Sequence, residues 1–112
     1  MRRMSFALTE PQLLDGSKTV TRRLGWSTIT PGTQLRAIRK GMGLKKGERQ
    51  HVLGELLVTA VRRERLDAIT DDDCTREGFP EMRAADFVEF FCRANSCKPD
   101  TLVTRIEFVR LS

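Results

Sequence analysis

The sequence predicts an α+β fold in which a small mixed or closed β-sheet carries two or three short helices packed at its ends. Three observations predict it. The chain has 112 residues, 39% of them hydrophobic and 31% charged, which suffices for one domain over residues 1–112 with a single core. Its elements run strand, short helix, about four strands, two helices and strand. The final strand has no strand beside it in sequence, so it must pair with a distant one.

The first elements are a short strand and a short helix. Met4–Leu8 (MSFAL) has the composition of a strand. Thr9 then stands at the N-cap of a helix, with Pro11 in the first turn and Gln12 at the capping-box position. Gly16 follows as a C-terminal stop, because glycine readily adopts the left-handed conformation that ends a helix.

Two further strands and a loop complete the first half. Thr19–Leu24 alternates like a strand, and Pro31-Gly32 has the residues of a type II turn. The next strand is Gln34–Arg39. Residues 40–50 hold three glycines and four basic residues, a composition that predicts a mobile hairpin loop.

The second half begins with the strongest strand signal, Leu53–Leu66, which is long enough that we expect it to bend midway. Thr70–Asp73 is a capping box that opens a helix, and Gly78–Pro80 ends that helix. Ala85–Ala94 has Phe87, Val88 and Phe91 at helical spacing, which predicts a second helix packed on the core. Leu102–Leu111 closes the chain as a strand.

Composition excludes several classes of protein. No apolar run is long enough to cross a membrane, and the N-terminus lacks the apolar region of a secretory signal, so we expect a soluble cytoplasmic protein, monomeric or weakly dimeric. The three cysteines and the one histidine make a zinc site arithmetically possible, but they lack paired knuckle spacing. We therefore expect free thiols, no metal and no cofactor. The acidic run Asp71–Asp73 is better explained by helix capping than by metal binding.

The charge is unevenly distributed. Residues 1–50 contain 11 Lys and Arg against 3 Asp and Glu, whereas residues 51–112 contain 9 against 12. A basic first half predicts a partner that carries phosphates, such as RNA or DNA, with the basic loop following its backbone. The alternative is solvated surface charge that keeps the protein soluble, on a loop that is simply mobile.

The segment GSKTVTRR, residues 16–23, carries the most chemistry. It is not a phosphate-binding P-loop, because no glycine stands directly before Lys18 or earlier in the chain than Gly16. Strand alternation places Thr21 and Arg23 on one face. A lysine beside a threonine can bind a phosphate or carbonyl oxygen. If burial lowers its pKa, the lysine can instead accept the hydroxyl proton and make the threonine a nucleophile.

Several segments together resemble the ASCH domain family of the PUA-like superfamily. They are GSKTVTRR, PGTQLRAI, the stretch from LLVTAV to TREGF, and the closing VTRIEF. The resemblance covers the whole chain and implies a PUA-like β-barrel with a cleft that binds RNA or other nucleic acid. The sequence departs from the family at Thr33, where an aspartate is common.

The resemblance extends to small stand-alone amidohydrolases that deacetylate N4-acetylcytidine. It implies that Thr21 attacks the amide carbonyl, Lys18 activates it, and Glu77 orients the lysine or moves protons to the leaving amine. Other family members are described as nucleic-acid binders or ribonucleases, so the family alone leaves the reaction open. Glu77 also has a plainer interpretation, as a solvated charge or the salt-bridge partner of an arginine.

The first hypothesis is therefore a cleft that binds RNA, DNA or a modified nucleoside, and the alternative is a metal-free amidohydrolase of N4-acylated cytidines. A third possibility is an interaction module that uses the basic face to bind an acidic protein. Trp26, the one tryptophan, is a candidate to stack on a base, although core packing explains it equally well. The candidate nucleic-acid contacts are Lys18, Thr19, Arg22, Arg23, Trp26, Lys40, Lys45 and Lys46.

Overall fold

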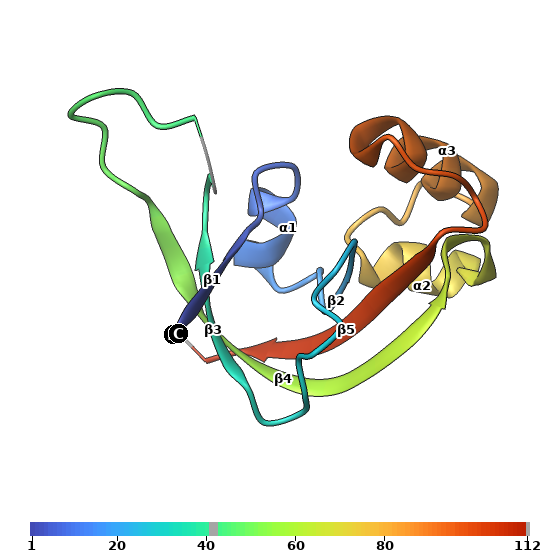
Figure 1. Ribbon diagram of the computed structural model, residues 1–112, viewed down its shortest axis with the longest axis horizontal. Coiled ribbons are helices and arrows are strands. Elements are labelled where there is room, and N and C mark those ends of the chain that lie inside the picture. Colours follow the sequence, from blue (N-terminus) through green and yellow to red (C-terminus); the bar gives the residue numbers. More distant parts are fainter. Residues whose placement is uncertain (41–42, 112) are drawn as a thin grey trace.

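The computed structural model describes residues 1–40 and 43–111. Across these residues, five strands form one mixed sheet in the order β1-β3-β4-β5-β2. The strands are β1 (Arg2–Ser5), β2 (Val20–Arg23), β3 (Gln34–Ile38), β4 (Val52–Arg65) and β5 (Leu102–Arg110). Only the β1–β3 pair is parallel among them. The sheet curves into a half barrel (Figure 1), which confirms the predicted α+β fold.

The two longest strands form the spine of the sheet. β4 pairs with β5 from Leu56↔Arg110 to Arg65↔Leu102, and the register shifts between Val58 and Ala60. A register shift of this kind bends a strand, so the predicted bend in the long strand is confirmed. β5 also pairs with β2 on its other side, which gives the closing strand the distant partners that it was expected to need.

Three α-helices and one 3₁₀ helix occur in the described residues: α1 (Glu10–Asp15), η1 (Leu66–Ala68), α2 (Asp71–Arg76) and α3 (Ala84–Asn95). Gly16 has φ 83° and ends α1 as predicted. The capping box predicted at Thr9 is wrong, since no side-chain capping bond is found there within the described residues. The Gln12 amide donates instead to the Gly78 carbonyl, 3.3 Å away, and so ties α1 to the segment after α2.

Only one of the two hydrogen bonds of the capping box predicted for α2 is present in the described residues. The Thr70 hydroxyl accepts a hydrogen bond from the Asp73 N–H at 3.2 Å, as expected of an N-cap. The Asp73 carboxylate does not return to the cap. It binds two arginines instead.

Two apolar clusters form the core. The barrel cluster lies inside the curved sheet and contains Met4, Phe6, Leu13, Ile29, Leu35, Ala37, Leu53, Leu56, Val58, Ile106 and Phe108. The helix cluster packs α2 and α3 on the far ends of β4 and β5 and contains Leu66, Ile69, Cys74, Phe87, Phe91 and Val103. α1 and α3 stand on the same side of the sheet, apart from one another (Figure 1).

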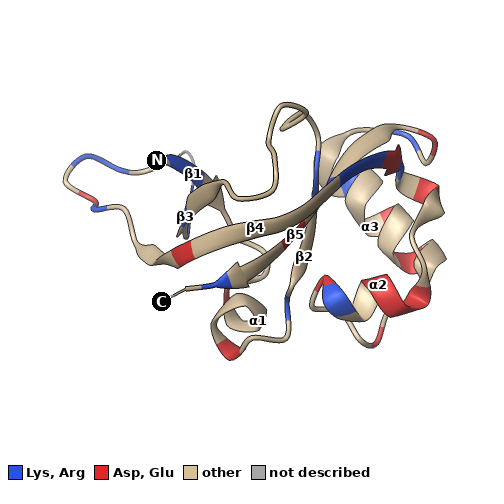
Figure 2. Cartoon of the chain, turned by 90° about the horizontal axis from the view of Figure 1, so that it is seen from below, with Lys and Arg blue, Asp and Glu red and all other residues tan. Residues whose placement is uncertain are grey.

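The charged residues are unevenly distributed over the molecule. Figure 2 shows Lys and Arg along β1 and the loop before β4, and Asp and Glu gathered on α2 and α3 at the opposite end. The basic loop is described except at residues 41 and 42, which lie outside the described residues. No helix in the described part of the chain is long and apolar enough to cross a membrane.

The cysteines are free thiols in the described structure, as expected, and Cys74 is buried. Within residues 1–40 and 43–111, no group of three or more His, Cys, Asp and Glu side chains is arranged to hold a metal ion.

Candidate functional site

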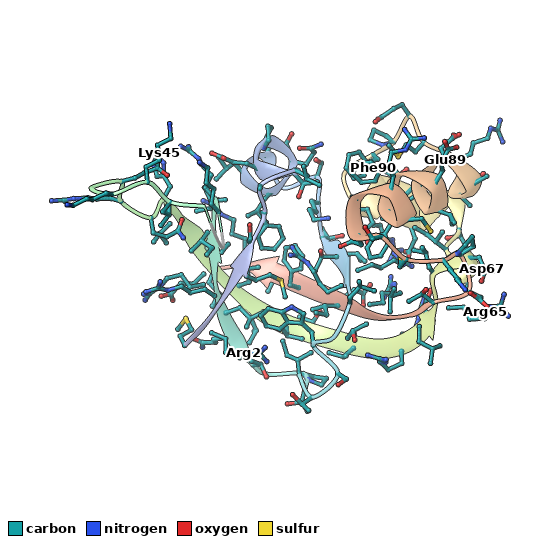
Figure 3. The ribbon with its side chains drawn as sticks, turned by 45° about the horizontal axis from the view of Figure 1, so that its top comes forward. Arg2, Lys45, Arg65, Asp67, Glu89 and Phe90 are labelled. Carbon is teal, nitrogen blue, oxygen red and sulfur yellow. The ribbon has the colours of Figure 1, made fainter. Side chains whose placement is uncertain are left out.

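A pocket of about 260 Å³ opens between the two apolar clusters. One wall is Ser5–Thr9, the end of β1 and the residues that follow it, and the other wall is α3 together with Phe79. The phenylalanines of the second wall pack against one another. The ring centroids of Phe79 and Phe90 lie 5.3 Å apart, and those of Phe87 and Phe90 lie 6.1 Å apart. In Figure 3, Phe90 lies on the side of α3 that faces α1, whereas its neighbour Glu89 lies on the outer side.

Lys18 reaches the pocket from the turn after α1. Its backbone N–H donates to the Gln12 carbonyl at 3.0 Å, which follows directly from the left-handed Gly16. The side chain is buried, and its Nζ donates to Glu77 Oε1 at 2.8 Å and to the Glu77 carbonyl at 2.9 Å. Burial lowers the pKa of the Lys18 ammonium below its usual value, and the negative charge of Glu77 opposes that effect.

Glu77 ends α2 and is buried as deeply as Lys18, each being 3% exposed. Lys18 holds one carboxylate oxygen, and Arg22 Nη1 donates to the other at 3.1 Å. Gly78 makes this placement possible. It has φ +99°, which favours glycine. A Cβ at this position would lie 2.8 Å from the Gln12 Cβ, closer than two carbon atoms that are not bonded to one another can approach.

Behind Glu77 lies a chain of buried ion pairs. Arg22 contacts Asp73 at 2.5 Å and Glu64 at 3.3 Å in addition to Glu77. Arg105 donates to both Asp73 oxygens, at 2.7 and 3.0 Å. These bonds from Arg105, and then the charge of Arg22, hold the pKa of the Asp73 carboxyl far below its usual range although burial acts in the opposite direction.

The sheet register explains why Asp73 is needed. Arg22 and Arg105 are direct partners on β2 and β5, where like charges repel. The Asp73 carboxylate binds both guanidinium groups and removes that repulsion.

Sequence reasoning missed this role of Asp73 and Arg105, because the pairing of β2 with β5 is not visible in the order of the residues. The Nε of Arg22 is buried and has no hydrogen-bond partner among the described residues.

Thr21 and Arg23 complete the pocket from β2. The Thr21 Oγ1 accepts a hydrogen bond from Arg23 Nε at 3.0 Å, so the two side chains share a face as alternation predicted. Thr21 is buried, and Arg23 is partly exposed. The Arg23 guanidinium lies over the Phe6 ring, 4.9 Å from its centroid. Desolvation lowers the pKa of Arg23 to about 10, so Arg23 stays charged at neutral pH.

The structure therefore brings Lys18, Thr21 and Glu77 to one pocket, with Arg22 and Arg23 beside them. The other candidate residues lie elsewhere. The Thr19 side chain is exposed, and Trp26 packs on the barrel cluster beneath Arg2, whose guanidinium carbon is 3.9 Å from the ring.

The candidate lysines of the loop also lie away from the pocket. Lys40 pairs with Glu48 at 3.5 Å, and Lys45 and Lys46 are exposed. Figure 3 shows Lys45 on the loop, at the opposite end of the molecule from α3.

Comparison with known proteins identifies the fold. No protein-family model matches the chain, and no curated protein matches it in sequence. Solved structures do resemble it, among them two bacterial proteins. The ASCH domain from Lactobacillus crispatus JV V101 superposes with a TM-score of 0.67 at 15% identity, over 97% of this chain and 78% of that one.

The second is protein EF3133 from Enterococcus faecalis V583, described under the family model DUF984. It superposes with a TM-score of 0.62 at 14% identity, over 91% of this chain and 69% of that one. The chain thus has an ASCH-like α+β fold, which confirms the resemblance seen in the sequence at the level of structure.

Proposed function

We propose that this chain binds a single nucleobase, of a modified nucleoside or of an unpaired position in RNA or DNA, in the pocket around Lys18, Thr21 and Glu77. The observation that carries the proposal is the meeting of these polar groups with a wall of phenylalanines in one small cavity. At about 260 Å³ the cavity is smaller than most drug-binding pockets, which suits one base rather than a stretch of polymer. Aromatic rings offer a base a stacking surface, and the polar groups can bind its carbonyl and amino groups.

A polymer would need a second contact region. The loop lysines and the arginines of β1 supply positive charge outside the pocket, and such groups bind phosphates without regard to sequence. Under this proposal the pocket selects the base, and the basic end of the molecule contributes affinity that depends on salt.

Calorimetric titration with cytidine, N4-acetylcytidine and a short single-stranded RNA tests the proposal. We expect all three to bind at low salt, and we expect only the RNA to weaken steeply as salt is added. Phe90→Ala should weaken each of them by about 1–3 kcal/mol through lost stacking, whereas Glu89→Ala on the outer side of α3 should not. Failure of every ligand to bind at low salt would end the proposal.

A second candidate function is hydrolysis of the acyl amide of N4-acylated cytidines. The specific observation that favours it is a lysine with a lowered pKa, 2.8 Å from a carboxylate, in the pocket that also holds a buried threonine hydroxyl. Lys18 would pass a proton to Glu77 across that hydrogen bond. As a neutral amine it would then accept the Thr21 proton while Oγ1 bonds to the carbonyl carbon.

The remaining steps use the same groups. The proton returns through the Lys18–Glu77 pair to the leaving nitrogen, the C–N bond breaks, and cytidine departs. Lys18 again passes a proton to Glu77, and water gives one proton to the neutral amine as its oxygen bonds to the Thr21 ester carbon. When the ester C–O bond breaks, Lys18 returns that proton to Oγ1, and acetic acid leaves and ionises to acetate. Glu77 then returns its proton to Lys18.

Turnover of N4-acetylcytidine to cytidine tests this candidate. Thr21→Val preserves the shape of the side chain and removes the hydroxyl, so we expect it to abolish turnover, while Thr21→Ser should retain part of it. Thr59→Val, at an exposed position of β4, is the matched control and should be as active as the unmodified protein. Full activity in Thr21→Val would exclude Thr21 as the nucleophile.

A further inference from the structure

Two partly exposed cysteines meet where α3 ends. Cys92 lies in the last turn of the helix, and Cys97 is the second residue after it. The N–H of Cys97 donates to the Cys92 carbonyl at 3.2 Å, and Ser96 is left-handed, with φ 51°. This hydrogen bond, from the sixth residue back to the first, and the left-handed residue before it are those of a Schellman ending. Side chains at the first and sixth positions of such an ending frequently contact one another, so the ending brings the two thiols together.

The two thiols also interact with one another. Burial raises the pKa of the Cys92 thiol, and a hydrogen bond with the Cys97 thiol raises it further. Both side chains pack on the helix cluster, and both remain partly exposed. The third cysteine, Cys74, is fully buried in the same cluster. A small oxidant can therefore reach Cys92 and Cys97 from solvent but not Cys74.

The backbone of Ser96 indicates that this helix end is held in place. Helices that end in this way usually carry glycine at the left-handed position, because a side chain there is strained. Ser96 and Trp26 are the non-glycine residues with positive φ in residues 1–40 and 43–111. A strained conformation persists where neighbouring contacts fix it, and the Cys92–Cys97 pair supplies such a contact.

We propose that Cys92 and Cys97 form a reversible disulfide when the protein meets a peroxide, so that the end of α3 is a site of thiol oxidation. A disulfide forms without backbone movement only where the two side chains already face one another, because its geometry is narrow. The Schellman ending meets that condition within the existing fold. The site is independent of the ligand proposed for the pocket, because neither cysteine is among the described residues that line it.

The reaction balances with hydrogen peroxide as the co-reactant. Cys97 loses its proton, its sulfur bonds to one peroxide oxygen, the O–O bond breaks, and the leaving hydroxide takes up that proton as water. The Cys92 sulfur then attacks the sulfenic sulfur of Cys97, the S–O bond breaks, and the second hydroxide leaves as water with the Cys92 proton. The two thiols lose two electrons, and the peroxide gains them. The raised pKa of Cys92 favours this order, with Cys97 as the first thiol to react.

Oxidation would fix one part of the pocket rim. Ala94 and Asn95 line the pocket and lie between the two cysteines, inside the ring that the disulfide closes. The Asn95 amide donates to the Phe91 carbonyl at 3.0 Å, so the same turn is already tied to the aromatic wall. A covalent link across the turn restricts its local opening, which is the motion that lets backbone amides exchange with solvent. We therefore expect slower hydrogen exchange at residues 94–97 in the oxidised protein.

Peptide mapping of the oxidised protein tests the proposal. The full reduced chain is treated with a slight excess of hydrogen peroxide in the presence of a chelator, and the remaining thiols are then blocked in denaturant. Trypsin cleaves after Arg93, between the two cysteines, so a Cys92–Cys97 disulfide joins two peptides that are otherwise separate. We expect this joined pair as the main product, and a dithiol reductant should separate it.

Cysteine variants provide the controls. Cys92→Ser and Cys97→Ser should each abolish the joined pair, and Cys92→Ser should leave Cys97 as a sulfenic acid that dimedone captures. Cys74→Ala is the matched control and should form the pair as fast as the unmodified protein. Peptides joined through Cys74, a disulfide between two chains, or thiols that stay free until the protein unfolds would each overturn the proposal. Faster hydrogen exchange at residues 94–97 after oxidation would also overturn it, because the bond would then distort the helix end.

Discussion

The basic side chains of the first half of the chain fall into two groups, one buried and paired with carboxylates and the other exposed on a loop. Lys18 and Arg22 are each 3% exposed, and their partners are carboxylates from the second half of the chain. Lys45 and Lys46 are exposed on the loop before β4. The basic first half of the sequence is therefore not one positive surface. Folding neutralises its central part against the acidic second half and leaves the excess charge at the end that carries the loop.

The comparison has an energetic consequence. Burying a charge is costly, and a buried ion pair at best roughly offsets that cost, so removing one member leaves its partner buried and uncompensated. An exposed charge contributes little in either direction. Four variants test this difference and the packing that holds the buried charges in place, from the largest expected effect on stability to the smallest.

Arg22→Met should destabilise the protein most. It leaves Glu64, Asp73 and Glu77 without their shared partner, and breaking a buried pair in this way costs about 3–5 kcal/mol. Urea denaturation measures the change. Lys45→Met is the matched control on the loop and should shift stability by no more than about 0.5 kcal/mol. Equal effects of the two substitutions would contradict the contrast.

Asp73→Asn should cost about 1.5–3 kcal/mol at neutral pH, the range for hydrogen bonds to charged groups. The folded pKa of Asp73 lies below its unfolded value. Its contribution is therefore complete above the unfolded pKa and is lost as the pH falls below about 4 toward the folded pKa. Denaturation curves at several pH values should show the gap between Asp73→Asn and the unmodified protein narrowing in acid. A gap that stays constant would count against the ion pairs, and Asp100→Asn on the surface is the control.

Gly78→Ala tests the placement of Glu77 against a similar glycine in an exposed turn. Gly78 and Gly32 both have positive φ, of +99° and +92°, but only at Gly78 would a Cβ meet the side chain of Gln12. Gly78→Ala should therefore be less stable than Gly32→Ala by about 1–3 kcal/mol, the usual cost of overpacking. Thermal unfolding of the two variants side by side gives the comparison, and identical values would show that the contact with α1 does not matter.

The smallest effect on stability is expected for the double variant Lys45→Gln/Lys46→Gln. Neither side chain is buried, so unfolding should be unchanged within about 0.5 kcal/mol. If the loop contacts a nucleic-acid backbone, the slope of RNA affinity against salt concentration should decrease, by up to about two phosphate contacts. A change in binding of free N4-acetylcytidine, measured by titration, would contradict the separation of loop and pocket.

Most of the elements follow from local patterns in the sequence. Gly16 ends its helix and Thr70 caps α2, because each depends on neighbouring residues only. The bend of the long strand was expected from its length alone, although its position is set by the pairing with β5. The prediction that Lys18, Thr21 and Glu77 lie in one pocket came from the resemblance to a family and not from the periodicity of the sequence.

Features that depend on strand pairing could not be predicted. Arg22 faces Arg105 only because β2 pairs with β5. The aromatic wall could have been predicted from the sequence. Phe90 stands three residues after Phe87 and next to Phe91, so α3 carries a wider apolar face than a helix needs to pack on a core, and all three residues line the pocket.

The most direct test of the pocket is a nuclear magnetic resonance titration of the isotopically labelled protein with N4-acetylcytidine. We expect chemical-shift changes at Lys18, Thr21 and Glu77 and along the face of α3 that carries Phe90, with none in the basic loop. Shifts confined to the loop, or no shifts at ligand concentrations in the millimolar range, would contradict the claim that the buried charges serve a small-molecule pocket.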